Sequence, residues 1–380
     1  MEAEVVRGTG AGVQVPAVLA AVAAHGLPCA PPPAHAVDMG PGQWKRFLES
    51  VVEERLTGLL VRALEDGALV ATDQQRAQAA GAHRRMVFTT LFLESKMLGI
   101  VDLLAGCGID SRVLKGSAAA RLAYPDASLR PFIDIDLLVP SGRFDDAVRA
   151  LEAAGGHRNF PEPHPGFDQR FSKGATVVMP EGFELDLHRT LASGPFAHVI
   201  PPDDLFATCT PFEVGGRRML TLGAEERFLH ACLHAVLGTA PALLMPLRDV
   251  AQLALETPLD QRRIMELAER WHAQAVMARA VTVTWETLGL RQPHPLARWA
   301  ATYLPTRAEH HRLSAYAEGA TYASQVLAGL RDVKGTRAKA AYLRALAVPD
   351  SRYLEGRYIS QVVRWRQGLG AGWRWLRSLR

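Results

Sequence analysis

The sequence predicts an α+β fold, in which a small mixed sheet is flanked by helical regions on its N-terminal and C-terminal sides. Apolar residues recur at helical spacing before residue 108 and again after residue 222. Between these regions the pattern changes to short apolar runs separated by glycine and proline, which is typical of strands. The 380 residues suffice for two or three domains at about 150 residues each.

Composition excludes several classes of protein. Hydrophobic residues make up 48% of the chain and charged residues 22%, so burial of apolar surface can order the chain and disorder is excluded as its main state. No apolar run reaches about 18 residues, the length typical of a membrane-spanning helix. A formal net charge of +4 is too small to indicate a nucleic-acid partner by itself.

Cysteine usage and the first residues indicate a reducing compartment. The four cysteines form no CxxC pair, so the sequence indicates neither a zinc site nor a disulfide framework. They are Cys29, Cys107, Cys209 and Cys232. Acidic side chains at Glu2 and Glu4 argue against a signal peptide. We therefore expect a cytoplasmic protein.

The first 108 residues are expected to be mainly helical. Residues 1–40 are rich in Gly, Pro and Ala, which predicts one short helix followed by a Pro-rich linker. Residues 41–108 form a helical lead-in, with predicted helices over 43–66 and 73–105.

Residues 109–220 are predicted to form the α/β core. Its expected elements are a strand over 111–114, a helical turn over 118–124, a strand over 132–139, a helix over 143–154 and strands over 169–172, 175–179 and 183–188. Gly174 and Ala175 resemble a hairpin turn between the first two of the last three strands. Residues 221–380 are expected to be helical, divided by turn signals near 257–258, 292–295 and 348–350.

Two carboxylates in the core indicate a metal site. Asp134 and Asp136 alternate with apolar residues, so on a strand both project from one face. Adjacent carboxylates on a buried strand repel each other and lose hydration, a cost that a divalent cation offsets. Ligation by oxygen alone favours Mg²⁺ or Mn²⁺ over zinc. The alternative is an exposed edge strand with solvated charges.

A third carboxylate comes from the predicted strand over 183–188, where Glu184, Asp186 and His188 share one face. If this strand lies beside the strand of Asp134, three carboxylates converge, as in a two-metal site for phosphoryl transfer. Asp186 is the expected third ligand, with Glu184 as its rival. His188 is expected either to contact nucleotide or substrate or to cap the end of the strand.

Phosphate-binding groups precede the acidic pair. Gly116 and Ser117 follow a predicted strand and open a helix, so backbone N–H groups and a hydroxyl suit a triphosphate. Lys115 and Arg130 add positive charge. A strand-end role for Lys115 and a surface-loop role for Arg130 are the alternatives.

The chain resembles the uncharacterised nucleotidyltransferase family of the DNA polymerase β-type superfamily over roughly residues 45–260. The resemblance rests on Lys115-Gly116-Ser117, on the arginine ahead of residues 134–139, and on the later residues 185–188. The resemblance implies that residues 109–220 are a nucleotidyltransferase core. Residues implied to hold the nucleotide phosphates or the metals are Gly116, Ser117, Asp134, Asp136 and Asp186.

The resemblance also implies a reaction. NMP would pass from an NTP such as ATP to a hydroxyl-bearing acceptor with release of pyrophosphate, assisted by Mg²⁺ or Mn²⁺. The acceptor is left open among a small molecule, a protein and RNA. The alternative is a non-catalytic nucleotide-binding or RNA-binding interaction protein.

Two further motifs allow competing interpretations. His230 and His234 have the spacing of a helical zinc site, yet the glutamate of HExxH is missing, and a packed helix is favoured. From Ser351 onward, seven arginines and three tryptophans accompany one acidic residue. This basic segment suits contact with nucleic acid or a membrane surface, and equally an amphipathic helix that packs on the body of the protein.

Overall fold

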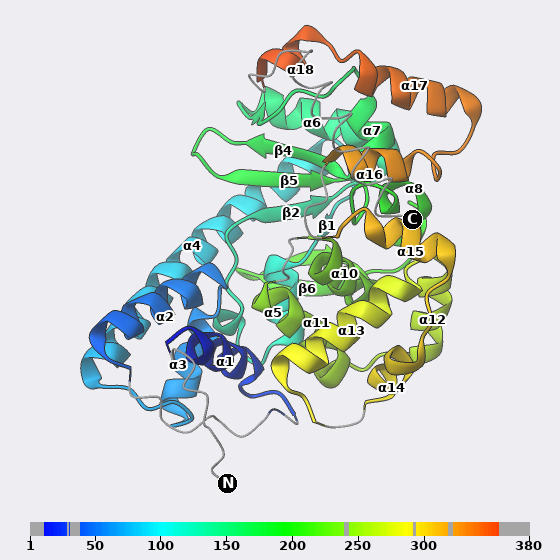
Figure 1. Cartoon of the computed structure of the whole chain (residues 1–380). Helices are drawn as coiled ribbons and strands as arrows, with labels where there is room; N and C mark the ends of the chain where they lie inside the picture. Colours follow the sequence, from blue (N-terminus) through cyan, green and yellow to red (C-terminus); the bar gives the residue numbers. More distant parts are fainter. Residues whose placement is uncertain are drawn as a thin grey trace.

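The computed structural model describes residues 11–28, 30, 39–238, 243–291, 294–317 and 322–356. In Figure 1 the sheet lies above the N-terminal helices and most of the C-terminal helices, which pack directly on each other, and the last two helices lie at the top of the view. The C-terminal residues of the predicted basic segment, 357–380, and the proline run at 31–33 lie outside the described residues.

The central sheet is mixed and has the strand order β1-β2-β5-β4-β3. Its strands are β1 (Arg112–Val113), β2 (Ile135–Leu138), β3 (His157–Arg158), β4 (Gly174–Val178) and β5 (Glu184–His188). β2 and β5 pair in parallel, whereas the other neighbours pair antiparallel. The predicted α+β fold with a small mixed sheet is confirmed.

Two helices and a second hairpin bury the apolar face of the sheet. The 34-residue α4 (Asp73–Gly106) and the shorter α6 (Phe144–Ala153) contribute side chains to one core with β2 and β5. The separate two-stranded sheet of β6 (Thr210–Val214) and β7 (Arg217–Thr221) closes the same core. The expected helix over 73–105 is confirmed. Other short elements near the sheet are α5 (Gly116–Ala123), η1 (Ala127–Leu129), η2 (Ser141–Arg143), α7 (Phe167–Phe171), α8 (Phe196–Val199) and α9 (Asp204–Ala207).

The N-terminal helices are α1 (Ala11–Ala24), α2 (Pro41–Glu53) and α3 (Thr57–Glu65). The predicted short helix within 1–40 is therefore present. The single helix expected over 43–66 is wrong, because the chain breaks after α2 and Arg55 takes a left-handed φ of 60°. Such a φ is unfavourable for a side chain with a Cβ atom and interrupts the helix.

The chain after β7 is helical in all of its described elements, as expected. These are α10 (Ala224–Leu237), α11 (Leu244–Glu256), α12 (Gln261–Arg270), α13 (Gln274–Leu288), α14 (Pro295–Thr302), α15 (Arg307–Ser314), α16 (Tyr322–Gly329), α17 (Thr336–Ala347) and α18 (Ser351–Gly356). Helices end or begin at each of the three predicted turn signals. Within the part of the chain that the structure describes, no helix is both long and apolar enough to cross a membrane.

The strand expected over 169–172 is wrong, because these residues lie in or just after α7. Local side-chain hydrogen bonds explain the helical turn. The carboxylate of Glu162 accepts hydrogen bonds from the N–H groups of Gly166 and Asp168, at 3.1 Å each. One turn later Ser172 Oγ donates to Asp168 Oδ1 at 2.6 Å. A four-residue apolar pattern does not reveal such bonds.

The hairpin turn expected at Gly174 and Ala175 is also wrong. Gly174 opens β4 opposite His188, and a Cβ atom on it would lie 2.0 Å from the carbonyl oxygen of Leu187. Glycine is therefore required by the close approach of β5 rather than by a turn. The turn between β4 and β5 lies instead around Gly182, whose φ is 82°.

A buried ion pair ties the sheet domain to the C-terminal helices. Arg130 Nη2 lies 2.6 Å from Asp249 Oδ2 on α11, and Tyr124 donates a hydrogen bond to Asp249 Oδ1 at 2.8 Å. Both members of the ion pair are buried. Because Arg130 precedes β2 by only a few residues, the pair fixes the segment that leads to Asp134.

We expect Asp249→Asn to lower the free energy of unfolding by about 3–5 kcal/mol, since it leaves the Arg130 guanidinium buried without a counter-charge. Urea denaturation followed by circular dichroism measures the change. The matched control is Glu266→Gln, which removes the exposed ion pair of Arg262 with Glu266 and should leave the midpoint unchanged. Equal midpoints for the two variants would contradict the prediction.

Candidate active site

The parallel pairing of β2 with β5 brings two of the predicted carboxylates together. Asp136 lies directly opposite Asp186, and Leu138 lies opposite His188. Residues in register project from the same face of a sheet. Ligand atoms of Asp136, Asp186 and His188 consequently lie within 4.8 Å of one another.

Asp134 is half-buried just before the start of β2, two positions from Asp136. Burial and the negative charge of Asp136 raise the pKa of Asp134. The strand expected over 132–139 is shorter than predicted, yet the charges of Asp136 and Asp186 still act on Asp134. The structure therefore brings Asp136 and Asp186 together with His188, and Asp134 lies near enough for its charge to interact with theirs without being one of the side chains at ligand spacing. Asp134, Asp136 and Asp186 are called the acidic cluster below.

Lys115 neutralises the carboxylate of Asp136, and His188 forms a hydrogen bond with the same oxygen. Lys115 Nζ and His188 Nε2 each lie 2.8 Å from Asp136 Oδ1, and the Asp136 side chain is only 1% exposed. Burial alone would raise the pKa of Asp136, but Lys115 and His188 hold it well below its usual range. Burial likewise opposes the charge on Lys115, and Asp136 and Asp134 outweigh it, so that the pKa of Lys115 is raised.

His188 is neutral in this arrangement. Burial and the positive charge of Lys173 lower the pKa of His188 to about 4. Because the carboxylate of Asp136 only accepts hydrogen bonds, Nε2 must carry the proton. Nδ1 is then an acceptor, and it has no hydrogen-bond partner among the described residues. The predicted contact of His188 with substrate is not tested by the structure, but His188 lies within the acidic cluster.

The turn between β1 and α5 is held in a strained conformation. Lys115 is the N-cap of α5 and has a φ of 41°. A non-glycine residue at such a φ costs on the order of 1–3 kcal/mol and requires support from its surroundings. A Cβ atom on the next residue, Gly116, would lie 3.2 Å from the ring of Phe132. The ion pair with Asp136 and the tight packing at Gly116 supply that support.

The Ser117 hydroxyl has a structural partner. Ser117 Oγ donates to Glu94 Oε1 of α4 at 2.6 Å, and Arg121 forms a two-pronged ion pair with the same carboxylate. Of the predicted phosphate donors, the hydroxyl is therefore occupied, and the backbone N–H groups of Gly116 and Ser117 are left. Glu94 thus anchors the first turn of α5 to α4.

Arg130 does not present a free cation to the acidic cluster. Its guanidinium is buried and paired with Asp249, as described above, and this pairing raises its pKa. The prediction that Arg130 binds nucleotide therefore finds no support in its position. A phosphate would have to break the buried ion pair to reach it. Glu184, the rival of Asp186, is exposed on β5 and belongs to no cluster with ligand spacing among the described residues.

Two basic residues that the sequence analysis did not single out act on the cluster. Arg55, in the break between α2 and α3, counteracts the rise in the pKa of Asp134 through its positive charge. Lys173, just before β4, is half-buried, and burial together with the charge of Lys115 lowers its pKa. Neither residue lies in a local sequence pattern that could have indicated this position.

A small cavity of about 30 Å³ borders the Lys115 side of the cluster. Lys115, the first turns of α5, and Arg227 and His230 of α10 line it. Nε and Nη1 of Arg227 are buried and have no hydrogen-bond partner in the described part of the chain. Unsatisfied N–H groups beside a helix N-terminus favour an anion.

The helical zinc site at His230 and His234 is not supported, since no third ligand joins them among the residues that the structure describes. Burial and the charge of Lys115 hold the pKa of both histidines well below their usual range. Both are neutral and pack within α10, as the preferred interpretation of the sequence held.

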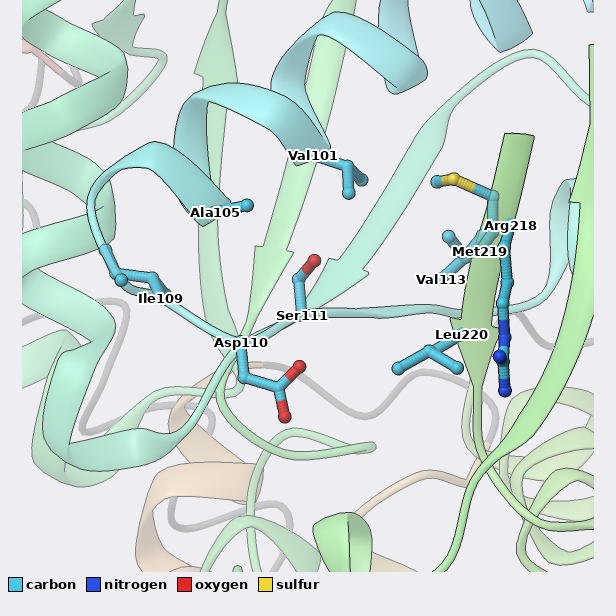
Figure 2. A pocket seen from close by; sticks show the side chains of 10 residues that line it. Val101, Ala105, Ile109, Asp110, Ser111, Val113, Arg218, Met219 and Leu220 are labelled. Carbon is cyan, nitrogen blue, oxygen red and sulfur yellow. The ribbon is translucent and has the colours of Figure 1, made fainter.

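Figure 2 shows a more open pocket of about 320 Å³ between the end of α4, β1 and β7. It contains none of the predicted site residues. Its acidic side chain, Asp110, is paired with Arg112 at 2.5 Å. This pocket therefore adds no group to the acidic cluster.

The acidic cluster fits a divalent cation by the chemistry of its donors. Asp134, Asp136 and Asp186 supply carboxylate oxygens, the ligands that Mg²⁺ and Mn²⁺ prefer. The nearby Lys115 ammonium shows that these buried carboxylates are stabilised by positive charge. The residues present thus fit the metal implied by the sequence.

Residues 40–289 match the family described as uncharacterised nucleotidyltransferase. The chain belongs to this nucleotidyltransferase family. The resemblance drawn from the residues around Lys115, Asp134 and Asp186 is confirmed. No match to a curated protein was found.

Two solved structures are similar to parts of this nucleotidyltransferase. The antibiotic-resistance factor ANT(2'')-Ia has 15% sequence identity and a TM-score of 0.34, over 50% of this chain and 92% of that chain. An antigenic nucleotidyltransferase-like protein from Paracoccidioides brasiliensis has 14% identity and a TM-score of 0.33, over 52% and 93%. At these TM-scores neither structure informs the site.

We expect this nucleotidyltransferase to bind Mn²⁺ and Asp186→Asn to weaken that binding at least about 10-fold, because even groups behind the metal ligands contribute about 10- to 100-fold. Isothermal titration calorimetry measures the affinity. Asp102→Asn is the matched control, since Asp102 forms an exposed ion pair with Arg217. Wild-type affinity in Asp186→Asn would refute the assignment of this ligand.

Proposed function

We propose that this protein is a divalent-metal-dependent enzyme that transfers NMP from an NTP to a hydroxyl group of an acceptor and releases pyrophosphate. The observation that carries the proposal is the group of Asp136, Asp186 and His188, whose ligand atoms lie within 4.8 Å of one another, with Asp134 nearby and the Lys115 ammonium in contact with Asp136. Membership of a nucleotidyltransferase family supports it. The N-terminus of α5 opens beside the same cluster.

Asp134, Asp136 and Asp186 would hold Mg²⁺ or Mn²⁺. When bound, the metal supplies positive charge that neutralises the triphosphate and stabilises the oxygen atoms between which the phosphoryl group moves. Lys115 already supplies part of that charge at Asp136. His188 donates to the same carboxylate and fixes its orientation.

The phosphate-binding side is formed by Lys115, the backbone of Gly116 and Ser117, and Arg227. The N-terminus of an eight-residue helix and the unsatisfied N–H groups of Arg227 favour negative charge at this point. Arg55 adds a further cation near Asp134. The enclosed space beside Arg227 is about 30 Å³, room for about one phosphate oxygen, so these groups would contact the edge of the triphosphate rather than enclose it.

The acceptor side is formed by Asp186. Thr176 donates a hydrogen bond to Asp186 Oδ1 at 2.6 Å, which leaves Oδ2 to accept the proton of the acceptor hydroxyl. The acceptor oxygen forms a bond to the α-phosphorus, the bond from this phosphorus to the bridging oxygen breaks, and pyrophosphate takes up that oxygen. The protein contributes mainly position and charge.

We expect Asp136→Asn to reduce NMP transfer by at least about 100-fold, the scale of losing one group that stabilises developing charge. Incubation with α-labelled ATP, Mg²⁺ and cell extract, followed by separation into protein, RNA and small-molecule fractions, measures transfer and identifies the acceptor class. Asp102→Asn should transfer label like the wild type. Unchanged labelling by Asp136→Asn would refute the proposed function.

Arg227→Met should raise the KM for ATP about 10-fold or more, since it removes charge-assisted hydrogen bonds to phosphate. Initial rates of pyrophosphate release at varied ATP measure this. The matched control is Arg218→Met on β7, where the arginine is exposed. Identical KM values for the two variants would remove Arg227 from the phosphate-binding side.

A further inference from the structure

A second cavity of about 250 Å³ is lined in part by Thr176, whose hydroxyl donates a hydrogen bond to Asp186. Three parts of the chain line it: residues 173–176 at the start of β4, the segment around Phe160, and the C-terminal helices. The function proposed above uses the Thr176 contact with Asp186 and leaves this cavity without a role.

Sheet register places the cavity next to Asp186. Asp136, Asp186 and Thr176 stand side by side on β2, β5 and β4. Lys115 contacts Asp136 on β2, whereas Thr176 on β4 lines the cavity. A molecule in the cavity would therefore approach Asp186 from the side of β4.

The walls of the cavity are rich in aromatic rings. Phe167 and Tyr342 stack with ring centroids 5.8 Å apart, and Phe171 meets Tyr342 edge-on at 5.1 Å. Phe160 lines the cavity and is 48% exposed. Among the polar lining groups, Ser193 and Gln325 share a hydrogen bond at 3.4 Å. The remaining lining is polar and includes Asp168, Lys173 and Thr176. Aromatic walls combined with polar groups suit a small organic ligand that carries both a ring and hydroxyl groups.

The volume limits the ligand. A cavity of about 250 Å³ holds on the order of ten non-hydrogen atoms, since one water occupies about 30 Å³ in the liquid. That is enough for a single substituted aromatic ring. A complete nucleoside would fill more than this volume and would extend from the open side of the cavity into solvent.

Part of the cavity wall lies outside the segment that matches the family. Gln325, Tyr342 and Tyr353 come from α16, α17 and α18, whereas the family match ends at residue 289. The acidic cluster and the phosphate-binding groups all lie within the match. The nucleotide-handling part is thus shared by the family, and this wall is added by the rest of this chain.

We propose that this cavity binds the acceptor and that the acceptor is a small, single-ring aromatic molecule carrying a hydroxyl group. The inference rests on the proposed function and specifies its acceptor. The ring lies among Phe160, Phe167 and Tyr342, and the hydroxyl is directed toward Asp186. Its oxygen takes the NMP group from the NTP, its proton passes to Asp186, and pyrophosphate leaves.

Binding can be tested without turnover. The probe is 2-(4-hydroxyphenyl)ethanol, which has one aromatic ring and two hydroxyl groups, and saturation-transfer NMR measures its binding to the full chain. Phe160→Ala should weaken binding at least about fivefold, the lower end of what one stacked ring contributes, and Phe160→Tyr should restore it. Phe88→Ala is the matched control, because Phe88 is 73% exposed on α4 and does not line the cavity.

Competition with nucleotide separates the two sides of the cluster. We expect saturating Mg²⁺ and a non-hydrolysable ATP analogue to leave the probe bound. Displacement of the probe would show that the nucleobase occupies the cavity and would overturn the proposal. Absence of probe binding, or equal weakening by Phe160→Ala and Phe88→Ala, would also overturn it.

Turnover distinguishes this proposal from the proposed function. Pyrophosphate release stimulated by the small-molecule fraction of a cell extract should fall in Phe160→Ala and persist in Phe88→Ala. Stimulated release that is equal in both variants, or label found on protein or RNA, would overturn the acceptor proposal alone. No release under any condition, with probe binding intact, would contradict the proposed function and leave the cavity as an aromatic-ligand site.

Discussion

The parallel pairing of β2 with β5 is the constraint on which the candidate site depends. It sets Asp136 opposite Asp186, although 50 positions separate them in the chain, and it brings His188 to the same face. A shift of the register by one residue would turn every one of these side chains to the other face of the sheet. The apolar residues between them, which fill the core beneath, therefore fix the positions of the carboxylates as firmly as any polar contact does.

Burial of so many ionisable groups is possible because their charges compensate one another. Asp136 is deeply buried, yet Lys115 and His188 keep it ionised. At Asp134 and Lys173 the balance is the opposite. Burial and like charges raise the pKa of Asp134 and lower that of Lys173, and both shifts favour the neutral form. The same principle holds farther from the cluster, where Arg130 is neutralised by Asp249. Such balance makes the site sensitive to any added cation or anion, which is what binding of metal and triphosphate requires.

The sequence allowed the acidic cluster to be predicted because alternation along a strand is a local pattern. Asp134, Asp136, Asp186 and His188 were expected on neighbouring strands, and the structure brings Asp136, Asp186 and His188 within ligand spacing, with Asp134 just before β2. Arg227 was not predicted, since its position beside Lys115 depends on how α10 packs on α5, which no neighbouring residue records. Arg130 was predicted to bind phosphate because its true partner, Asp249 on α11, lies 119 positions away and cannot be recognised from the neighbouring sequence. Residues 169–172 were predicted to form a strand because the side-chain hydrogen bonds that stabilise α7 cannot be recognised from the spacing of apolar residues.

The origin of the aromatic cavity has a consequence for the newly made chain. During translation, the strands that carry the carboxylates have all emerged once His188 has left the ribosome. The cavity beside them also needs Tyr342 and Tyr353, which are synthesised much later. The strands of the acidic cluster are therefore synthesised well before the residues that complete the wall of this cavity.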